Sequence, residues 1–250
     1  MIPLVSVITP TYNSSNHIRE AVDSVRQQTI KNIEHIIIDD ASEDDTVRII
    51  QNLNKSETSI NLISSTENVG PAKARNLGIE AARGRFIAFL DSDDIWFPEK
   101  LEKQISEMEH KKIPFCYSGY FWRDEDKGTS REIQVPSSLD YSKLLNSTII
   151  ATMTAIYDMQ ALGKVYMPDI RRRQDYALWL KILKTTPLAV GVTEPLGILR
   201  RHSNSYSSDT LKSLQYTWKV YTEIEKLPKL KALFHFLNYA SRAALKRLRR

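Results

Sequence analysis

The sequence contains a single cysteine, Cys116, among its 250 residues. One cysteine excludes an internal disulfide framework and any zinc site built from several cysteines, and it fits a reducing cytosol. No apolar run approaches the ~20 residues that a membrane-spanning helix needs. The opening segment, MIPLVSVITP, lacks the basic region of a secretory signal peptide. We therefore expect a cytoplasmic protein with either one large α/β domain or such a domain plus a small appendage.

Acidic residues are missing from the end of the chain. Residues 226–250 contain eight of the 35 lysines and arginines and no aspartate or glutamate. The remaining residues carry 27 basic and 30 acidic side chains, so the net charge of +5 comes from this segment alone. The body of the protein therefore gives no reason to expect nucleic acid as a partner.

The same basic segment has apolar residues at helical intervals. They are Leu230, Leu233, Phe234, Leu237, Ala240, Ala244, Leu245 and Leu248. The pattern predicts a helical, basic, amphipathic tail within 211–250, which can lie in a membrane interface. Anionic lipids would add about 1 kcal/mol per basic residue near the surface. The alternative is a helix docked on the catalytic body, with its basic end in solvent.

Strand-like and helical segments alternate over the first ~120 residues. The strand-like segments are 4–12, 33–40, 60–65 and 85–91, and the helical ones are 15–28, 42–54, 70–84 and 98–110. This order predicts an α/β fold with a mostly parallel central sheet flanked by helices on both faces. Further along, 148–158 and 188–202 are typical of strands, and 172–184 of an amphipathic helix.

Polar residues follow several of these strands directly. They are Thr9 to Asn13, Asp39-Asp40 and Asp91-Ser92-Asp93. In such sheets, ligands bind outside the carboxyl ends of the strands, so we expect one site at this edge. Two carboxylates at positions i and i+2 can share a divalent cation such as Mn²⁺ or Mg²⁺. The alternative is an acidic turn that caps the following helix.

Four segments in this order, VSVITPTYN, HIIIDDASEDDT, NVGPAKARNLGI and FIAFLDSDDIW, resemble the family 2 glycosyltransferases. The resemblance resumes at RRQDYALWL and ILRRHSNSYS and so spans most of the chain. It implies the GT-A fold, a Rossmann-like sheet with a helical C-terminal extension. It also implies a nucleotide-sugar donor-binding half at 1–115, an acceptor-binding and catalytic half at 116–210, and the tail at 211–250.

The resemblance further implies how a UDP-sugar donor is bound. A tyrosine ring such as Tyr12 can stack on uracil. The carboxylate of Asp40 can accept a hydrogen bond from the uracil N3–H, and the Arg75 guanidinium can bind the diphosphate or sugar. The full set of donor-binding residues expected is Thr9, Pro10, Tyr12, Asn13, Asp40, Arg75, Asn76, Asp91, Ser92, Asp93, Arg201 and Ser205.

The metal and the catalytic base are also assigned through the resemblance. Asp93 is the expected ligand of Mn²⁺ or Mg²⁺, with Asp91 and His202 as further candidates. Asp175 matches the base that deprotonates the acceptor hydroxyl, preceded here by Gln174 where the family usually has glutamate. Asp94 is expected outside the metal shell, where it could cap the next helix. Trp179 either lines the acceptor cleft or packs in the core.

Together, these features imply an inverting, metal-dependent hexosyltransferase that builds bacterial O-antigen or another surface polysaccharide. Its acceptor would be a polyprenyl-diphosphate-linked saccharide, reached from the inner face of the cytoplasmic membrane, and its product β-linked. A sugar-nucleotide pyrophosphorylase is a rival, but the loop TPTYNSS has no glycine with which to cradle a triphosphate. A non-catalytic membrane-associated protein is the other rival, and the presence of both Asp93 and Asp175 argues against it.

Overall fold

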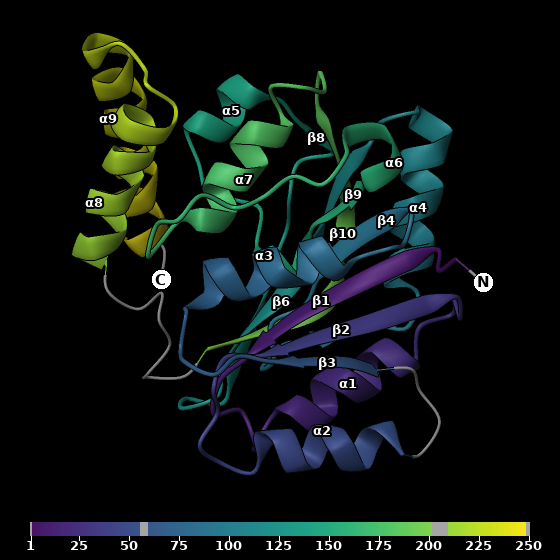
Figure 1. The fold of residues 1–250 in the computed structure, drawn as a ribbon. Helices are drawn as coiled ribbons and strands as arrows, with labels where there is room; N and C mark the ends of the chain where they lie inside the picture. Colours follow the sequence, from purple (N-terminus) through teal and green to yellow (C-terminus); the bar gives the residue numbers. More distant parts are fainter. Residues whose placement is uncertain (1, 56–59, 202–209, 249–250) are drawn as a thin grey trace.

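The computed structural model describes residues 2–55, 60–201 and 210–248 (Figure 1). In its first half, four parallel strands lie in the order β3-β2-β1-β4. Their bounds are β1 (Val5–Thr11), β2 (Ile33–Asp39), β3 (Ile60–Ser64) and β4 (Phe86–Phe89). Because all four strands run in the same direction, their carboxyl ends meet at one edge of the sheet, as the sequence predicts.

Helices cover both faces of this parallel unit, which is why its strands are apolar on both sides (Figure 1). α1 (Ile18–Arg26) and α2 (Thr46–Asn54) lie on one face, where Ile18 and Ile50 pack against Ile37. α3 (Pro71–Ala81) lies on the other face. Pro71 suits the start of α3, because the first turn of a helix has no internal partner for its N–H groups.

The second half of the sheet mixes strand directions. β9 (Ile156–Asp158) is antiparallel to both β4 and β6 (Phe115–Asp124), whereas β10 (Ala189–Arg201) is parallel to β6. Three short strands pair antiparallel at the margins: β5 (Ile95–Trp96), β7 (Thr129–Ile133) and β8 (Ser138–Leu139). The helices of this half are α4 (Lys100–Lys111), α5 (Tyr141–Leu145), α6 (Met159–Leu162) and α7 (Gln174–Ile182).

The prediction of one strand over 148–158 is wrong for most of its length. Only its last three residues belong to β9, and Thr152–Thr154 form a 3-10 turn, η1. Side chains satisfy carbonyl groups of this turn: the Trp96 indole donates to Met153 O at 2.7 Å, and Gln104 donates to Thr154 O at 2.8 Å. These bonds replace the ladder that a strand would need.

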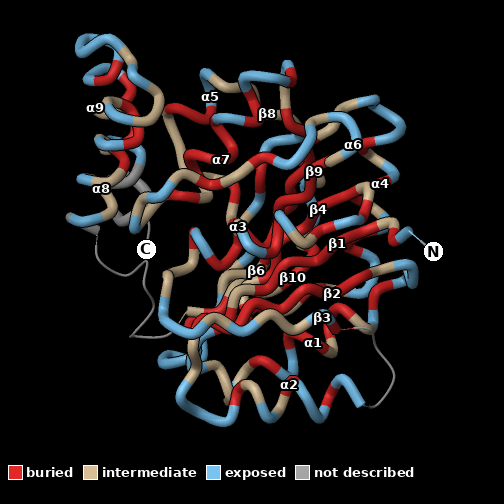
Figure 2. The backbone as a smooth tube through the Cα atoms, viewed as in Figure 1, coloured by how far each residue is buried: buried red, intermediate tan, exposed pale blue. Residues whose placement is uncertain are grey.

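α7 is more deeply buried than an amphipathic helix. All of its residues except Asp175 and Lys181 are buried, and Figure 2 shows the helix as buried over most of its length. Trp179 is 1% exposed, and its ring packs against Phe89 and Phe115 at centroid distances of 5.6 and 5.4 Å. Of the two alternatives for Trp179, the structure therefore selects the core.

The C-terminal region is a helical hairpin beside α5 and α7 (Figure 1). It consists of α8 (Thr210–Lys219), a π-helical turn η2 (Val220–Ile224) and α9 (Lys229–Leu248). One face of the hairpin docks on the body: Tyr221 donates to Leu145 O, and His235 lies 3.0 Å from the Asn146 side chain. The opposite face of α9 exposes large apolar side chains, namely Leu230, Leu233, Phe234 and Leu237. Within the described residues, no helix combines the length and apolarity needed to span a bilayer.

Candidate active site

Two adjoining cavities open at the carboxyl ends of β1, β2 and β4. The first, which we name the β1 cavity, has a volume of about 770 Å³ and extends from Pro10 at β1 to Asp93. The second, named the α7 cavity, has a volume of about 450 Å³ and includes Asp175 at the start of α7. The two cavities share Pro71, Arg75, Asp91 and Asp93 in their linings.

The rim of the β1 cavity is formed where β1 and β2 end. Asn13 has a left-handed backbone, with φ of 48°, and its side-chain oxygen accepts from Glu43 N at 2.8 Å. The Asn13 N–H donates to Ser42 Oγ at 2.9 Å, so the two strand ends are tied in both directions. Beside this rim, the Tyr12 ring lines the cavity and is 46% exposed. An exposed aromatic face at a cavity is suited to stacking on a planar ligand.

Asp40 is the buried acid of the β1 cavity. One of its carboxylate oxygens accepts from Val69 N at 2.7 Å and the other from Gly70 N at 2.9 Å. These bonds hold the entry to α3, where Gly70 has φ of 84° and Pro71 begins the helix. A carboxylate oxygen has a further lone pair, so Asp40 can accept an additional hydrogen bond from a ligand in the cavity.

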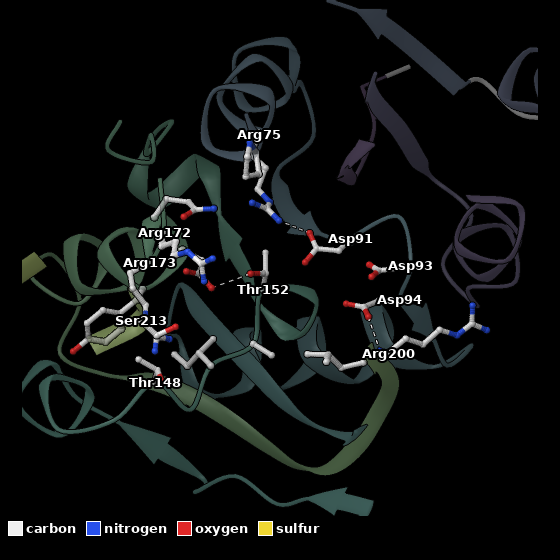
Figure 3. A pocket seen from close by; sticks show the side chains of 17 residues that line it. Arg75, Asp91, Asp93, Asp94, Thr148, Thr152, Arg172, Arg173, Arg200 and Ser213 are labelled. Carbon is white, nitrogen blue, oxygen red and sulfur yellow. Dashed lines mark hydrogen bonds and ion pairs between the residues drawn. The ribbon is translucent and has the colours of Figure 1, made fainter. Parts of the chain in front are cut away.

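An ion pair stands in the wall between the two cavities. The Arg75 guanidinium, on α3, donates to the Asp91 carboxylate, just after β4 (Figure 3). The Arg75 side chain is only 7% exposed, so this charge has been moved out of water into the site. Its Nε has no hydrogen-bond partner among the described residues. A buried guanidinium with a donor to spare can bind an anionic ligand between the cavities.

Three carboxylates crowd together after β4: those of Asp91, Asp93 and Asp94. Asp94 is 3% exposed, and its pKa is raised well above the ordinary value by burial and then by the charges of Asp93 and Asp91. Its carboxylate accepts from Arg200 N at 2.9 Å, which anchors the end of β10. Asp94 therefore does not cap the next helix, since α4 begins later, at Lys100.

The structure describes only some of the expected metal ligands. Over residues 2–55, 60–201 and 210–248, no three His, Cys, Asp or Glu side chains converge to form a complete metal site. Asp93 lines both cavities, whereas Asp91 is engaged by Arg75. His202 lies outside the described residues, so its expected role remains a prediction.

Asp175 lines the α7 cavity. It is in the first turn of α7 and partly exposed, and its Oδ2 accepts from the Thr152 hydroxyl at 3.1 Å. In Figure 3, Thr152 lies between Asp93 and Asp94 on one side and Arg172, Arg173, Thr148 and Ser213 on the other. The neighbouring Gln174 is buried, and its Oε1 has no hydrogen-bond partner among the described residues.

Most of the residues expected at the donor site do line the cavities. Those found there are Pro10, Tyr12, Asn13, Asp40, Arg75, Asp91, Ser92 and Asp93. Ser205 lies outside the described residues.

Three of the expected donor residues face elsewhere. Thr9 is buried beneath the site, where its hydroxyl meets His35 Nε2 at 2.9 Å. Asn76 follows Arg75 by one position on α3, so its side chain points in a different direction from that of Arg75. Its Nδ2 donates to Met167 O at 2.9 Å, and its Oδ1 accepts from Met167 N at 2.8 Å. Arg201 packs over the Trp122 ring at 5.9 Å, because alternate strand residues face opposite sides and Arg200 takes the cavity side. The structure brings none of these three into either cavity.

Several lining residues were not predicted from the sequence. In the β1 cavity they include Ser14, His17 and Asn68. In the α7 cavity they include Thr148, Thr152, Arg172, Arg173, Arg200 and Ser213. A signal for two of these was present, since the run at 171–173 directly precedes Gln174-Asp175.

A largely parallel α/β sheet with carboxylates, a buried arginine and two joined cavities at its strand ends fits a transferase, and the comparisons with known proteins identify the class. The chain belongs to glycosyl transferase family 2, whose model matches residues 6–166. The protein is therefore a glycosyltransferase, and its fold is the GT-A fold.

Two sequence relatives extend the match over nearly the whole chain. TuaG of Bacillus subtilis (strain 168), a glycosyltransferase assigned to teichuronic acid biosynthesis, is 44% identical over 98% of this chain and 98% of its own. WfgD of Escherichia coli, a UDP-Glc:α-D-GlcNAc-diphosphoundecaprenol β-1,3-glucosyltransferase, is 36% identical over 94% of this chain and 92% of its own. Among solved structures, S. aureus TarS 1–349 in complex with UDP-GlcNAc has a TM-score of 0.74 at 20% identity, covering 95% of this chain and 72% of that one.

Proposed function

We propose that the protein is an inverting, metal-dependent glycosyltransferase that transfers a hexose from a UDP-sugar to a polyprenyl-diphosphate-linked saccharide. The reaction would serve the synthesis of bacterial O-antigen or another surface polysaccharide. One observation carries the proposal: the carboxylate of Asp175 lies in a cavity that shares Arg75, Asp91 and Asp93 with the β1 cavity. The name of WfgD, with its UDP-Glc donor and lipid-diphosphate acceptor, supports the choice of substrates.

The β1 cavity is suited to the nucleotide of the donor. Tyr12 offers an exposed ring for the uracil face, and Asp40 offers an acceptor for its N3–H. From there the diphosphate would run toward Arg75, whose buried guanidinium provides donors for phosphate oxygens. The hexose would then lie where the two cavities join. On this proposal, residues 1–115 supply the donor site and 116–210 most of the acceptor site.

Asp175 would act as the general base on the acceptor hydroxyl. The hydrogen bond from Thr152 leaves the second carboxylate oxygen available to take the proton. The acceptor would approach from the α7 cavity while the diphosphate departs toward the β1 cavity. Attack and departure on opposite faces of the anomeric carbon invert its configuration, so an α-linked donor gives a β-linked product.

The carboxylates after β4 fit a divalent cation. Burial and the charges of Asp93 and Asp91 raise the pKa of Asp94, so the site concentrates negative charge that a cation would relieve. Asp93 would be the direct ligand, because Arg75 already engages Asp91. Bound there with the diphosphate, Mn²⁺ or Mg²⁺ would stabilise the charge that develops on the leaving UDP.

A transfer assay tests this proposal. Purified protein is given a panel of UDP-hexoses, starting with UDP-glucose, and a synthetic GlcNAc-diphosphate-lipid, with Mn²⁺, Mg²⁺ or EDTA. We expect one donor to react, EDTA to stop transfer, and Asp175→Asn to slow it by roughly 100-fold or more. Asp126→Asn, at an exposed turn, is the matched control and should behave as wild type. If Asp175→Asn retains full transfer, the assignment of the base is wrong.

Peripheral attachment to the inner face of the cytoplasmic membrane belongs to the same proposal. The exposed apolar side chains of α9 include Phe234, which is 61% exposed, and lysines at 229 and 231 are exposed beside them. Basic and apolar groups on one helix favour an interface with anionic lipid. We expect Phe234→Glu to weaken co-sedimentation with anionic vesicles more than Ser241→Glu, which places the same charge at another exposed position of α9. Equal binding by the two variants would contradict attachment through this face.

A further inference from the structure

The α7 cavity contains four arginines, and their charges are balanced in different ways. Arg75 pairs with Asp91, and Arg200 pairs with Glu20 and Glu125. Arg173, in contrast, donates to the neutral Tyr239 hydroxyl, and none of the described residues forms an ion pair with it. At the end of the cavity that Arg172 and Arg173 line, Arg173 therefore contributes a positive charge that has no ion-pair partner among the described residues, in a lining that is otherwise rich in carboxylates.

This positive end lies away from the carboxylates that fit the metal. Figure 3 shows Arg172, Arg173, Thr148 and Ser213 on one side of Thr152, and Asp93 with Asp94 on the other. Asp175 accepts a hydrogen bond from Thr152, the residue that lies between the two ends in this view. A molecule that presents a hydroxyl to Asp175 can therefore extend toward the two arginines, which line the same cavity.

The local backbone adds to the positive potential. Arg173 is the N-cap of α7, a helix of nine residues, and has φ of 65°. The N-terminus of a helix carries partial positive charge and unpaired N–H groups, which favour anions. The Nε of Arg173 also has no hydrogen-bond partner among the described residues. Helix terminus and arginines thus point to the same class of ligand, a phosphate group.

We propose that Arg172 and Arg173 form the subsite for the diphosphate of the acceptor. The proposal rests on the proposed function, in which the acceptor is a sugar joined to a lipid through a diphosphate. When the reacting hydroxyl and the diphosphate belong to the same sugar ring, a cationic group must lie about one ring away from the base. Guanidinium groups bind phosphate oxygens through paired, charge-assisted hydrogen bonds, which suits them to this position.

The C-terminal hairpin borders this subsite. Ser213 of α8 lines the cavity, and Tyr239 of α9 holds the Arg173 guanidinium, with the cation 5.7 Å from its ring. A lipid attached to a diphosphate at this position would leave the cavity beside the hairpin. Removal of the whole hairpin would disturb the subsite, so single substitutions are the sharper test.

The test compares two acceptors that carry the same sugar, a GlcNAc-diphosphate-lipid and an uncharged alkyl GlcNAc glycoside. Arg172→Ala should raise the KM for the diphosphate acceptor by about tenfold or more, because charge-assisted hydrogen bonds are lost. It should leave kcat/KM for the uncharged acceptor and the Kd for UDP unchanged. Arg172→Lys should fall between, since it keeps the charge but not the paired donors.

Arg171→Ala is the matched control, because Arg171 belongs to the same basic run but is exposed and is not part of the cavity lining. It should behave as wild type with both acceptors. Equal losses on the two acceptors for Arg172→Ala, or no loss on either, would overturn the subsite.

Direct binding of the same two compounds, by calorimetry in the presence of UDP, separates the subsite from the proposed function. If the wild type transfers nothing yet binds the diphosphate compound, and Arg172→Ala weakens that binding, only the function fails. Equal binding of both compounds by the wild type would overturn the subsite itself.

Discussion

The β1 cavity and the α7 cavity are built in different ways, although they share a wall. The β1 cavity is framed by bonds between side chains and nearby backbone, such as Glu43 N to Asn13 and Val69 N to Asp40. The α7 cavity is assembled from segments spread between residues 71 and 213, joined by contacts such as Thr152–Asp175 and Arg173–Tyr239. The position of a cavity that depends on strand ends and turns is set by the sheet itself. The ligand specificity of the α7 cavity can change through substitutions in several separate segments.

The largest expected effect is a loss of kcat that comes from the α7 cavity alone. Asp175→Asn removes the proposed base from the α7 cavity and keeps the shape of the side chain. We expect kcat to fall by roughly 10²- to 10⁴-fold, because that is the usual contribution of general base catalysis. The KM for the UDP-sugar and the Kd for UDP should stay close to wild type, since Asp175 is absent from the β1 cavity. Steady-state kinetics and calorimetry with UDP measure the two quantities. A large change in UDP affinity would mean that the cavities are not separate in function.

The reciprocal change lies in the β1 cavity. Asp40→Asn replaces one of two carboxylate oxygens with an NH₂ group that faces a backbone N–H donor. The unpaired buried donor should cost about 1–3 kcal/mol of unfolding free energy. UDP affinity should fall about tenfold, because the entry to α3 and the acceptor for uracil change together. Denaturant unfolding and UDP calorimetry test this, with Glu43→Gln, an exposed side chain of the same acidic segment, as the control. Unchanged UDP affinity in Asp40→Asn would remove Asp40 from the donor site.

The same difference in construction explains what could be predicted from the sequence. Strand ends follow from apolar runs that stop at polar residues. The sequence therefore predicts Tyr12, Asn13, Asp40 and Asp93 at one edge, and the structure places all four in the lining of the β1 cavity. The direction in which a side chain faces was harder to predict. Whether Thr9 faces inward depends on its pairing with His35, which is set by the register between β1 and β2.

Beyond the wall that it shares with the β1 cavity, the α7 cavity was predicted only at Asp175. Arginines before a helix are usually solvated, and the one signal in the run at 171–173 is its position directly before Gln174-Asp175. Its position depends on the hairpin partner Tyr239, which lies 66 residues further along the chain. Long-range partners of this kind cannot be inferred from local periodicity, which is also why Trp179 remained ambiguous until its contacts with Phe89 and Phe115 were known.

A smaller effect is expected from the interior beneath the β1 cavity. Burial, and then the nearby charge of Arg26, lower the pKa of His35 from 6.5 to about 3. Between these two values the unfolded chain binds a proton that the folded protein does not, so the free energy of unfolding falls as the pH is lowered from 6.5 toward 3. The slope from this group reaches about 1.4 kcal/mol per pH unit. Urea unfolding at pH 7.0, 5.5 and 4.5 should show a shallower decline for His35→Gln than for wild type. Parallel curves would show that His35 titrates alike in both states.

The smallest expected effect concerns two residues at the rim of the β1 cavity that share a left-handed backbone. Ala41 has φ of 63° and Asn13 has φ of 48°. This conformation costs an alanine roughly 1–2 kcal/mol, whereas glycine adopts it without steric cost but loses more conformational entropy on folding. Ala41→Gly should therefore raise the unfolding free energy by about 0.5 kcal/mol. Asn13→Gly should lower it, because the bond from Glu43 N to the Asn13 side chain disappears. Denaturant midpoints of the two variants measured side by side test this, and a loss of stability in both would mean that Ala41 makes contacts worth more than its backbone strain. A gain in Ala41→Gly with unchanged UDP affinity would show that the turn after Asp40 carries strain that donor binding does not use.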